Sequence, residues 1–239
     1  MTWPTVPWSQ VPTVSSAALR QADEQASSRF GIEPIQLMEV AGWQVARFID
    51  RFVDGVRGKR VTIVAGSGNN GGDALVAARF LHQRGAIVRA SIVPPRDPNS
   101  LAARHALTIG RLGIPMVEAP HGVEASADLL VDGLFGIGIR LPLRDPAPGI
   151  VAAMNASHAP IVAIDVPSGL DADSDGGQEG AVRATATITL VAPKAALRGT
   201  PNAGRVFVAD IGMPIGVFSS EREALAGLYQ IGDMVELTN

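Results

Sequence analysis

The chain has 239 residues, a formal net charge of −3 and no cysteine. The slightly acidic balance leaves no basic face that would favour nucleic acid, and the lack of cysteine excludes disulfides and thiolate catalysis. No basic, apolar leader opens the chain and no apolar run reaches the roughly 20 residues of a membrane span, so we expect no membrane association and a cytoplasmic protein.

The first dozen residues predict an extended arm rather than a helix, because prolines recur there beside Trp3 and Trp8. The tryptophans suit packing on a partner subunit and on the arm's own domain equally well. Ser15 or Ser16 can cap a helix that runs to about Arg29. A second helix is expected from Pro34, where apolar residues repeat at helical spacing as far as position 52.

Residues 61–73 read VTIVAGSGNNGGD, a β-branched strand that leads into a glycine-rich loop. A helical pattern follows over residues 74–82. Strand, glycine loop and helix N-terminus together favour an anion site, because the first helical N–H groups lack partners within the helix. The loop is not a P-loop, since no Gly-Lys-Ser/Thr follows, and its glycines read GxGxxGG, one residue off the usual context of the dinucleotide-binding motif.

Beyond this motif, strand-like and helical segments alternate to the end of the chain. This order predicts a single α/β domain over residues 1–239, a three-layer αβα sandwich with a Rossmann-like, mainly parallel sheet. We place the core at 13–215 and a tail at 216–239, which is either a linker or a closing helix. The expected strands are 87–93, 129–131, 161–164, 187–191 and 206–208, and the expected helices are 99–112 and 148–157.

Three aspartates follow expected strands. Asp73 comes after the first strand and its loop, while Asp132 and Asp165 end later strands, each with glycine nearby. Parallel strands deliver such residues to one edge of the sheet, where ligands bind. A single aspartate in this position more often caps a turn, but three together favour a functional site.

Four motifs occur along the chain in this order: GIEPIQLMEVAG (31–42), GSGNNGGD (66–73), DGLFGIG (132–138) and AIDVPSGLDAD (163–173), with a later PK and DIGMP (210–214). Together they resemble the NAD(P)H-hydrate epimerase family, also called the YjeF N-terminal domain. The resemblance covers about residues 13–215. Two positions depart from the usual pattern: Ala74 replaces a glycine, and Ile137 replaces a threonine whose hydroxyl would suit a phosphate.

The resemblance implies an isomerase that interconverts the R and S hydrates of NADH and NADPH, whose S form a separate NAD(P)H-hydrate dehydratase then repairs. It implies Asp165 as the general acid/base and a homodimer. It also implies a potassium ion held by Asn70, Asp132 and Ser168, an oxygen set that suits an alkali ion better than zinc. The substrate would contact Asn69, Asn70, Gly71, Gly72, Asp73, Gly136, Ile137, Gly138, Ile139, Arg140 and Asp165.

Other interpretations stay open. The same fold serves non-catalytic nucleotide-binding or scaffold modules, although the retained polar residues favour an enzyme. A conventional dinucleotide oxidoreductase is disfavoured, because no carboxylate ends the second strand. Lys194 either points into the cleft or serves in a buried salt bridge. We expect Asp171, Asp173 and Asp175 to form a solvated loop.

Overall fold

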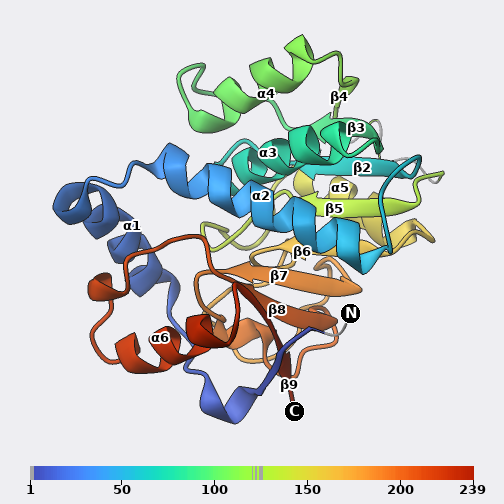
Figure 1. Cartoon of the computed structure of the whole chain (residues 1–239). Coiled ribbons are helices and arrows are strands. Elements are labelled where there is room, and N and C mark those ends of the chain that lie inside the picture. The colour runs from blue at the N-terminus through green and yellow to red at the C-terminus, as the bar shows by residue number, and fades with distance from the viewer. Residues whose placement is uncertain (1–2, 120, 122, 124–125) are drawn as a thin grey trace.

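The computed structural model describes residues 3–119, 121, 123 and 126–239; residues 1 and 2 of the expected arm lie outside this range. Within the described chain, one sheet has the strand order β1-β9-β8-β7-β6-β5-β2-β3-β4. Only the β8–β9 pair is antiparallel. The strands are β1 Thr5–Pro7, β2 Arg60–Ala65, β3 Ile87–Ile92, β4 Met116–Glu118, β5 Leu129–Gly133, β6 Ile161–Ile164, β7 Ala186–Leu190, β8 Arg205–Ala209 and β9 Met234–Thr238 (Figure 1).

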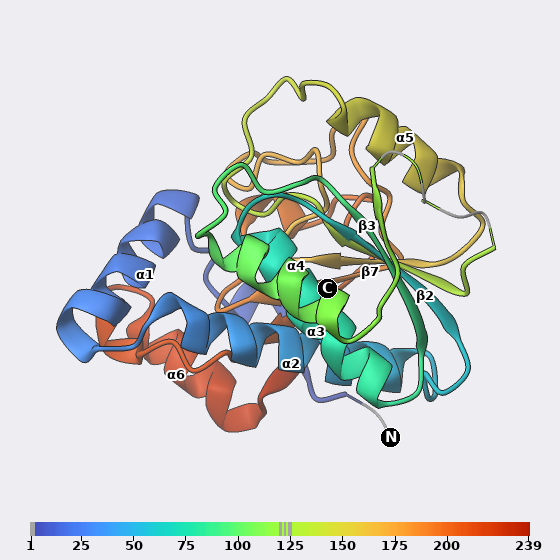
Figure 2. The same cartoon turned by 90° about the horizontal axis from the view of Figure 1, so that it is seen from above.

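Helices cover both faces of the sheet, which confirms the expected αβα sandwich. Helices α2 (Pro34–Phe52), α3 (Asn69–Gln83) and α4 (Leu101–Arg111) lie on one face and α5 (Ala147–Ala156) on the other, as the view from above shows (Figure 2). Irregular segments complete the second face, where Leu170, Ala181 and Leu197 pack on the last strands. The helices are α1 Ser16–Phe30, α2 Pro34–Phe52, α3 Asn69–Gln83, α4 Leu101–Arg111, α5 Ala147–Ala156 and α6 Arg222–Ile231, with 3₁₀ turns at Trp8–Gln10, Ala195–Leu197 and Ile215–Val217.

The expected helix starts are confirmed by their caps. The Ser15 side chain accepts a hydrogen bond from the N–H of Ala18 and begins α1. Gly31 ends it with a left-handed φ of 67°, a conformation that glycine adopts without a Cβ penalty. Pro34 occupies the first turn of α2, behind a capping box formed by Glu33 and Gln36.

The start of α3 corrects the sequence prediction. We expected a glycine loop before a helix at residue 74, but the helix begins at Asn69 and includes Gly71 and Gly72. Both lie against neighbouring atoms: a Cβ on Gly71 would lie 1.9 Å from the carbonyl oxygen of Gly66, and a Cβ on Gly72 would lie 2.6 Å from the Met38 side chain. The pair of asparagines therefore stands in the first helical turn, at the positive end of the helix dipole.

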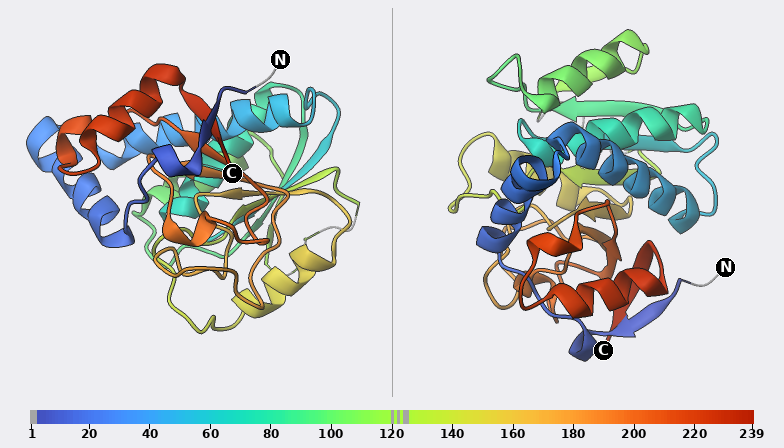
Figure 3. Two further views of the ribbon diagram at one scale, coloured as in Figure 1. Left: turned by 90° about the horizontal axis from the view of Figure 1, so that it is seen from below. Right: turned by 60° about the vertical axis from the view of Figure 1, so that its left-hand side comes forward.

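Both chain ends belong to the sheet. The tail forms α6 and then β9, which pairs with β8 on one side and with β1 on the other. The ends of the chain therefore lie beside each other at one edge (Figure 3). The short strands β1, β4 and β9 were missed from sequence, because three to five residues carry too little alternation to be recognised.

The tryptophans of the arm pack on their own domain. The Trp3 ring lies 5.4 Å from Phe48 and 5.3 Å from Phe207, measured between ring centroids. The Arg51 guanidinium covers its other face at 3.7 Å. Trp8 is buried on the opposite side of the sheet. The arm therefore closes the core at this edge.

Replacing Trp3 with alanine should lower the free energy of unfolding by about 2 kcal/mol, because a half-buried aromatic contact with Phe48 and Phe207 is lost. Chemical denaturation measures the loss. Trp43→Ala is the matched control, since Trp43 is 39% exposed and should contribute less. Unchanged stability in the Trp3 variant, with a change in oligomeric state by light scattering, would instead place the arm on a partner.

Candidate functional site

A cavity of about 540 Å³ opens at the carboxyl edge of the sheet. It lies where the chain order reverses: β3 and β4 extend from one side of β2, while β5, β6 and β7 extend from the other. Such a switch point is where open parallel sheets bind ligands. The segments after β2, β5, β6 and β7 form its walls, and α1 and α2 cover it.

The first turn of α3 forms one wall of this cavity. Asn70 is held in place because its side-chain N–H donates to the carbonyl of Ile164 at 3.3 Å. Its amide oxygen faces the opposite loop, since a Cβ on Gly136 would lie 3.3 Å from it and 2.9 Å from a carboxylate oxygen of Asp165. The amide, the carboxylate and the α3 N-terminus thus face one space.

Asp165 follows β6 in a left-handed conformation, with φ of 68°. Such a backbone is uncommon outside glycine, and neighbouring contacts must hold it. One carboxylate oxygen accepts from the Lys194 ammonium, which also donates to the Thr189 hydroxyl at 3.0 Å and the Leu190 carbonyl at 2.8 Å. Lys194 is 1% exposed. A buried cation therefore contacts Asp165 directly.

Lys194 thus fits both sequence interpretations. It lines the cavity and it makes a buried ion pair. Its neighbour Val191 also has a positive φ, of 66°, and is anchored because the hydroxyl of Tyr229 on α6 donates to its carbonyl at 2.5 Å. The tail therefore supports the wall that carries Lys194.

Asp132 lies fully buried behind the cavity rather than on its surface. The Ser168 N–H and hydroxyl each donate to it at 2.7 Å, and the Leu134 N–H donates at 3.1 Å. Ser168 also accepts from the N–H of Phe135 at 2.9 Å, which ties the loop after β5 to the turn after β6. Burial raises the pKa of Asp132 to about 6, although the bonds from Ser168 and Leu134 oppose that rise.

Two further carboxyl groups line the cavity. Burial, then the charges of Asp165 and Asp23, raise the pKa of Asp73 well above its usual value. Asp23 stands on the solvent-accessible rim, yet desolvation and the charge of Asp165 raise its pKa as well. Three carboxylates therefore share the space, and the one that contacts a cation is Asp165.

The structure brings most of the expected substrate residues together. Those that line the cavity are Asn69, Asn70, Asp73, Gly136, Ile137, Gly138 and Asp165. Gly71 and Gly72 are buried behind the wall in α3. Neither Ile139 nor Arg140 is among the described lining residues, and Arg140 is exposed. Contact with a ligand in the cavity is thus favoured for the first group only.

Sequence reasoning missed the contribution of α1. Arg20 and Asp23 both line the cavity. The sequence did contain a signal for Asp23, because this residue stands four positions after the apolar Leu19 and therefore shares its helix face, which is buried in the structure. The start of α1 is tied to the turn beyond β6, since the Ser16 N–H donates to Asp173 at 2.7 Å. Asp171, Asp173 and Asp175 are all exposed, as expected for a solvated loop, and Asp173 in addition anchors α1.

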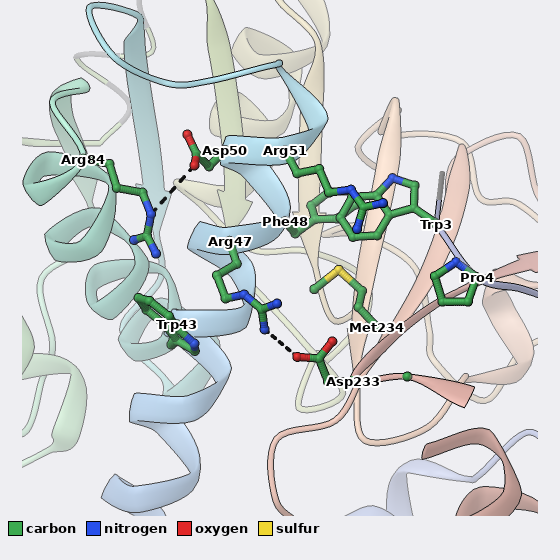
Figure 4. Close-up of a pocket in the computed structure, with 11 residues that line it drawn as sticks. Trp3, Pro4, Trp43, Arg47, Phe48, Asp50, Arg51, Arg84, Asp233 and Met234 are labelled. Carbon is green, nitrogen blue, oxygen red and sulfur yellow. Dashed lines mark hydrogen bonds and ion pairs between the residues drawn. The ribbon is translucent and has the colours of Figure 1, made fainter. Parts of the chain in front are cut away.

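A second cavity, of about 390 Å³, lies between the C-terminal half of α2 and the start of β9 (Figure 4). Its charged side chains are paired among themselves: Arg47 contacts Asp233 at 2.5 Å, and Arg84 lies 3.9 Å from Asp50. Arg51 stacks on Trp3. This hollow holds the arm in place and has no group poised for acid/base chemistry among its described residues.

Known proteins identify the family. The family model described as YjeF-related protein N-terminus matches residues 34–196. The chain belongs to this family. A crystal structure of yeast ynu0 superposes with a TM-score of 0.76 at 26% identity, covering 89% of this chain and 98% of the yeast one. The shared YjeF fold therefore extends well beyond the matched segment.

Named relatives of the family come from several lineages. The chain is 38% identical to the bifunctional NAD(P)H-hydrate repair enzyme of Moorella thermoacetica, over 84% of this chain and 40% of that protein. It is 35% identical to the NAD(P)H-hydrate epimerase of Limosilactobacillus fermentum, over 82% of this chain and 95% of that protein. The chain thus spans about 40% of the length of the bifunctional relative but nearly all of the Limosilactobacillus fermentum epimerase.

Among the described residues, no helix has the length and apolarity that crossing a membrane requires.

The buried Asp132 should make stability depend on pH. Its pKa is about 6 in the folded state and about 4 in an unfolded chain. The folded state therefore binds the extra proton, and the free energy of unfolding falls as pH rises through this window, by roughly 3 kcal/mol. Asp132→Asn should remove that part of the slope. Denaturation in alkali-free buffer at about pH 4 and about pH 7 measures it; identical slopes would contradict the assignment.

Proposed function

We propose that this protein is an NAD(P)H-hydrate epimerase, an isomerase that interconverts the R and S hydrates of NADH and NADPH. The observation that carries the proposal is the Asp165–Lys194 pair, which faces the first turn of α3 across a cavity large enough for part of a dinucleotide. Relatives named for this activity support it, one of which is covered almost completely.

Asp165 is the proposed general acid/base. The stereocentre is a ring carbon that bears a hydroxyl next to the ring nitrogen. The nitrogen lone pair forms a C=N bond as the C–O bond breaks, and a proton delivered to the departing oxygen makes water. Water then adds to the opposite face, its proton returns to the carboxylate, and the ring nitrogen recovers its lone pair. Atoms and charges balance, so no redox partner is required.

Lys194 has a supporting role in this proposal. Its ammonium holds one oxygen of Asp165 and leaves the other towards Gly136 and the cavity. The carboxylate is thus fixed in position before substrate arrives. The neighbouring Asp73 meets an environment that raises its pKa and so favours its protonated form. Carboxyl groups held in different environments within one site are typical of acid/base enzymes.

Substrate binding is proposed to use the cavity walls. The first N–H groups of α3, from Asn69 to Gly71, would meet the phosphates, because helix N-termini favour anions. Asn70, Asp73 and the backbone of Gly136 to Gly138 would position the rest of the molecule. Ile139 and Arg140 lie farther along this loop, and we propose contacts for them only with parts of the substrate that project from the cavity.

A potassium ion fits the oxygen atoms behind the cavity. Asn70, Asp132 and Ser168 converge on the loop from Gly133 to Gly136, and the Phe135 carbonyl lies 3.4 Å from the Ser168 hydroxyl. Among the described residues no cluster of three His, Cys, Asp or Glu suits a transition metal. One carboxylate with amide, hydroxyl and carbonyl oxygens suits an alkali ion. When bound, the ion would supply positive charge that offsets Asp132 and the substrate phosphates.

We further propose, from the family resemblance, a homodimer that works in the cytoplasm beside an NAD(P)H-hydrate dehydratase. The bifunctional names of the relatives from Moorella thermoacetica and Salinibacter ruber support a dehydratase as functional partner.

Asp165→Asn should reduce epimerisation at least 100-fold, because the amide cannot exchange the proton. Each purified hydrate epimer is incubated with the variant, and the two epimers are separated chromatographically over time. Asp175→Asn is the control, since it makes the same change at an exposed loop position. Full activity in the Asp165 variant would remove Asp165 from the role.

Replacing tetramethylammonium by potassium, at constant ionic strength and at about ten times the dissociation constant, should stabilise the fold by roughly 1.4 kcal/mol. The melting temperature should therefore rise by about 3–6 °C. The rise should be larger at about pH 7.5 than at about pH 5, because Asp132 is then charged. Differential scanning calorimetry measures it. Asp132→Asn should abolish the effect; an equal rise in that variant would count against this site.

A further inference from the structure

The charge of the cavity raises a question about its ligand. The described lining residues include the carboxyl groups of Asp23, Asp73 and Asp165, against the cations Lys194 and Arg20. The substrate of the proposed function carries a diphosphate with two negative charges. An anion of this kind needs a cation with donors to spare, in addition to the N–H groups of α3.

Lys194 does not meet this need. An ammonium has three N–H donors, and those of Lys194 already contact Asp165, the Thr189 hydroxyl and the Leu190 carbonyl. The side chain is also 1% exposed, so a phosphate would have to displace the carboxylate in order to reach it.

Arg20 has the opposite character. It lies on α1 at the open rim, and its guanidinium donates to the Ile137 carbonyl at 3.4 Å and to the Ser16 hydroxyl at 3.2 Å. Both acceptors are neutral, and within the described chain no ion pair joins Arg20 to a carboxylate. A guanidinium has five N–H donors, so most of them are available to a ligand.

The position of Arg20 is fixed before any ligand binds. The Ser16 hydroxyl that accepts from Arg20 itself donates to Asp173 at 2.5 Å, which anchors this turn of α1 to the segment after β6. The bond to Ile137 places the guanidinium on the Gly136–Gly138 loop. Side chains held in this way lose little freedom on binding.

We propose that Arg20 binds the diphosphate of the dinucleotide substrate, which it holds between the Gly136–Gly138 loop and the first turn of α3. Its planar fork matches phosphate oxygens, which the donors not used by Ile137 and Ser16 can meet. This proposal rests on the proposed function for its substrate. It assigns the binding of the diphosphate to α1, a helix outside the segment that the family model matches.

Calorimetric titration with three probes tests this proposal. ADP-ribose carries the diphosphate, adenosine 2′-monophosphate carries a single phosphate, and adenosine carries none. Arg20→Gln should weaken ADP-ribose binding 10- to 100-fold and leave adenosine unchanged. Arg20→Lys should recover part of the loss. Arg29→Gln is the matched control, because Arg29 is an exposed arginine of the same helix whose guanidinium contacts Gln25 and the Phe30 ring and is not among the described residues that line the cavity. An unchanged ADP-ribose affinity in Arg20→Gln, or a loss confined to adenosine 2′-monophosphate, overturns the proposal.

Kinetics separate this proposal from the proposed function. With a hydrate epimer as substrate, Arg20→Gln should raise KM by about the same factor by which it weakens ADP-ribose binding. Its kcat should stay within a factor of about three of the wild-type value. A fall in kcat at unchanged KM overturns the diphosphate role. If wild type does not epimerise, the proposed function fails, while weaker ADP-ribose binding in Arg20→Gln still upholds the diphosphate site.

Discussion

The ion pair between Asp165 and Lys194 is the contact on which the site depends. Both groups sit where water is largely excluded, and an unpaired charge there would be strongly unfavourable. The pair also holds together two stretches of backbone in left-handed conformations, at Asp165 and at Val191. Removal of either charge would therefore leave the other buried without its counter-ion.

The carboxyl groups around this pair differ because their surroundings differ. Asp165 contacts a cation, Asp132 receives three hydrogen bonds in a fully buried position, and Asp73 has neither. Burial therefore raises the pKa of Asp132 and of Asp73, whereas the charge of Asp165 is paired with that of Lys194.

The described structure also shows how much of the site comes from outside the matched family segment. The rim residues Arg20 and Asp23 belong to α1, and Tyr229 of α6 holds the carbonyl of Val191. Both chain ends meet in adjacent strands, β1 and β9, which closes the sheet beside β8. The family motifs supply the chemistry, while the flanking segments close and support the cavity.

The alternation of strands and helices, the starts of α1 and α2, and the aspartates at the strand ends could be predicted from the sequence, because hydrophobic period, capping residues and glycine are local signals. The start of α3 could not, since Gly71 and Gly72 suggest a loop until packing against Gly66 and Met38 explains them. Three relations needed the folded structure: Lys194 pairs with Asp165, twenty-nine residues earlier, Asp132 lies behind the cavity, and α1 covers the cavity. Those relations join residues far apart in the chain, and they arise only when the strands are placed in register.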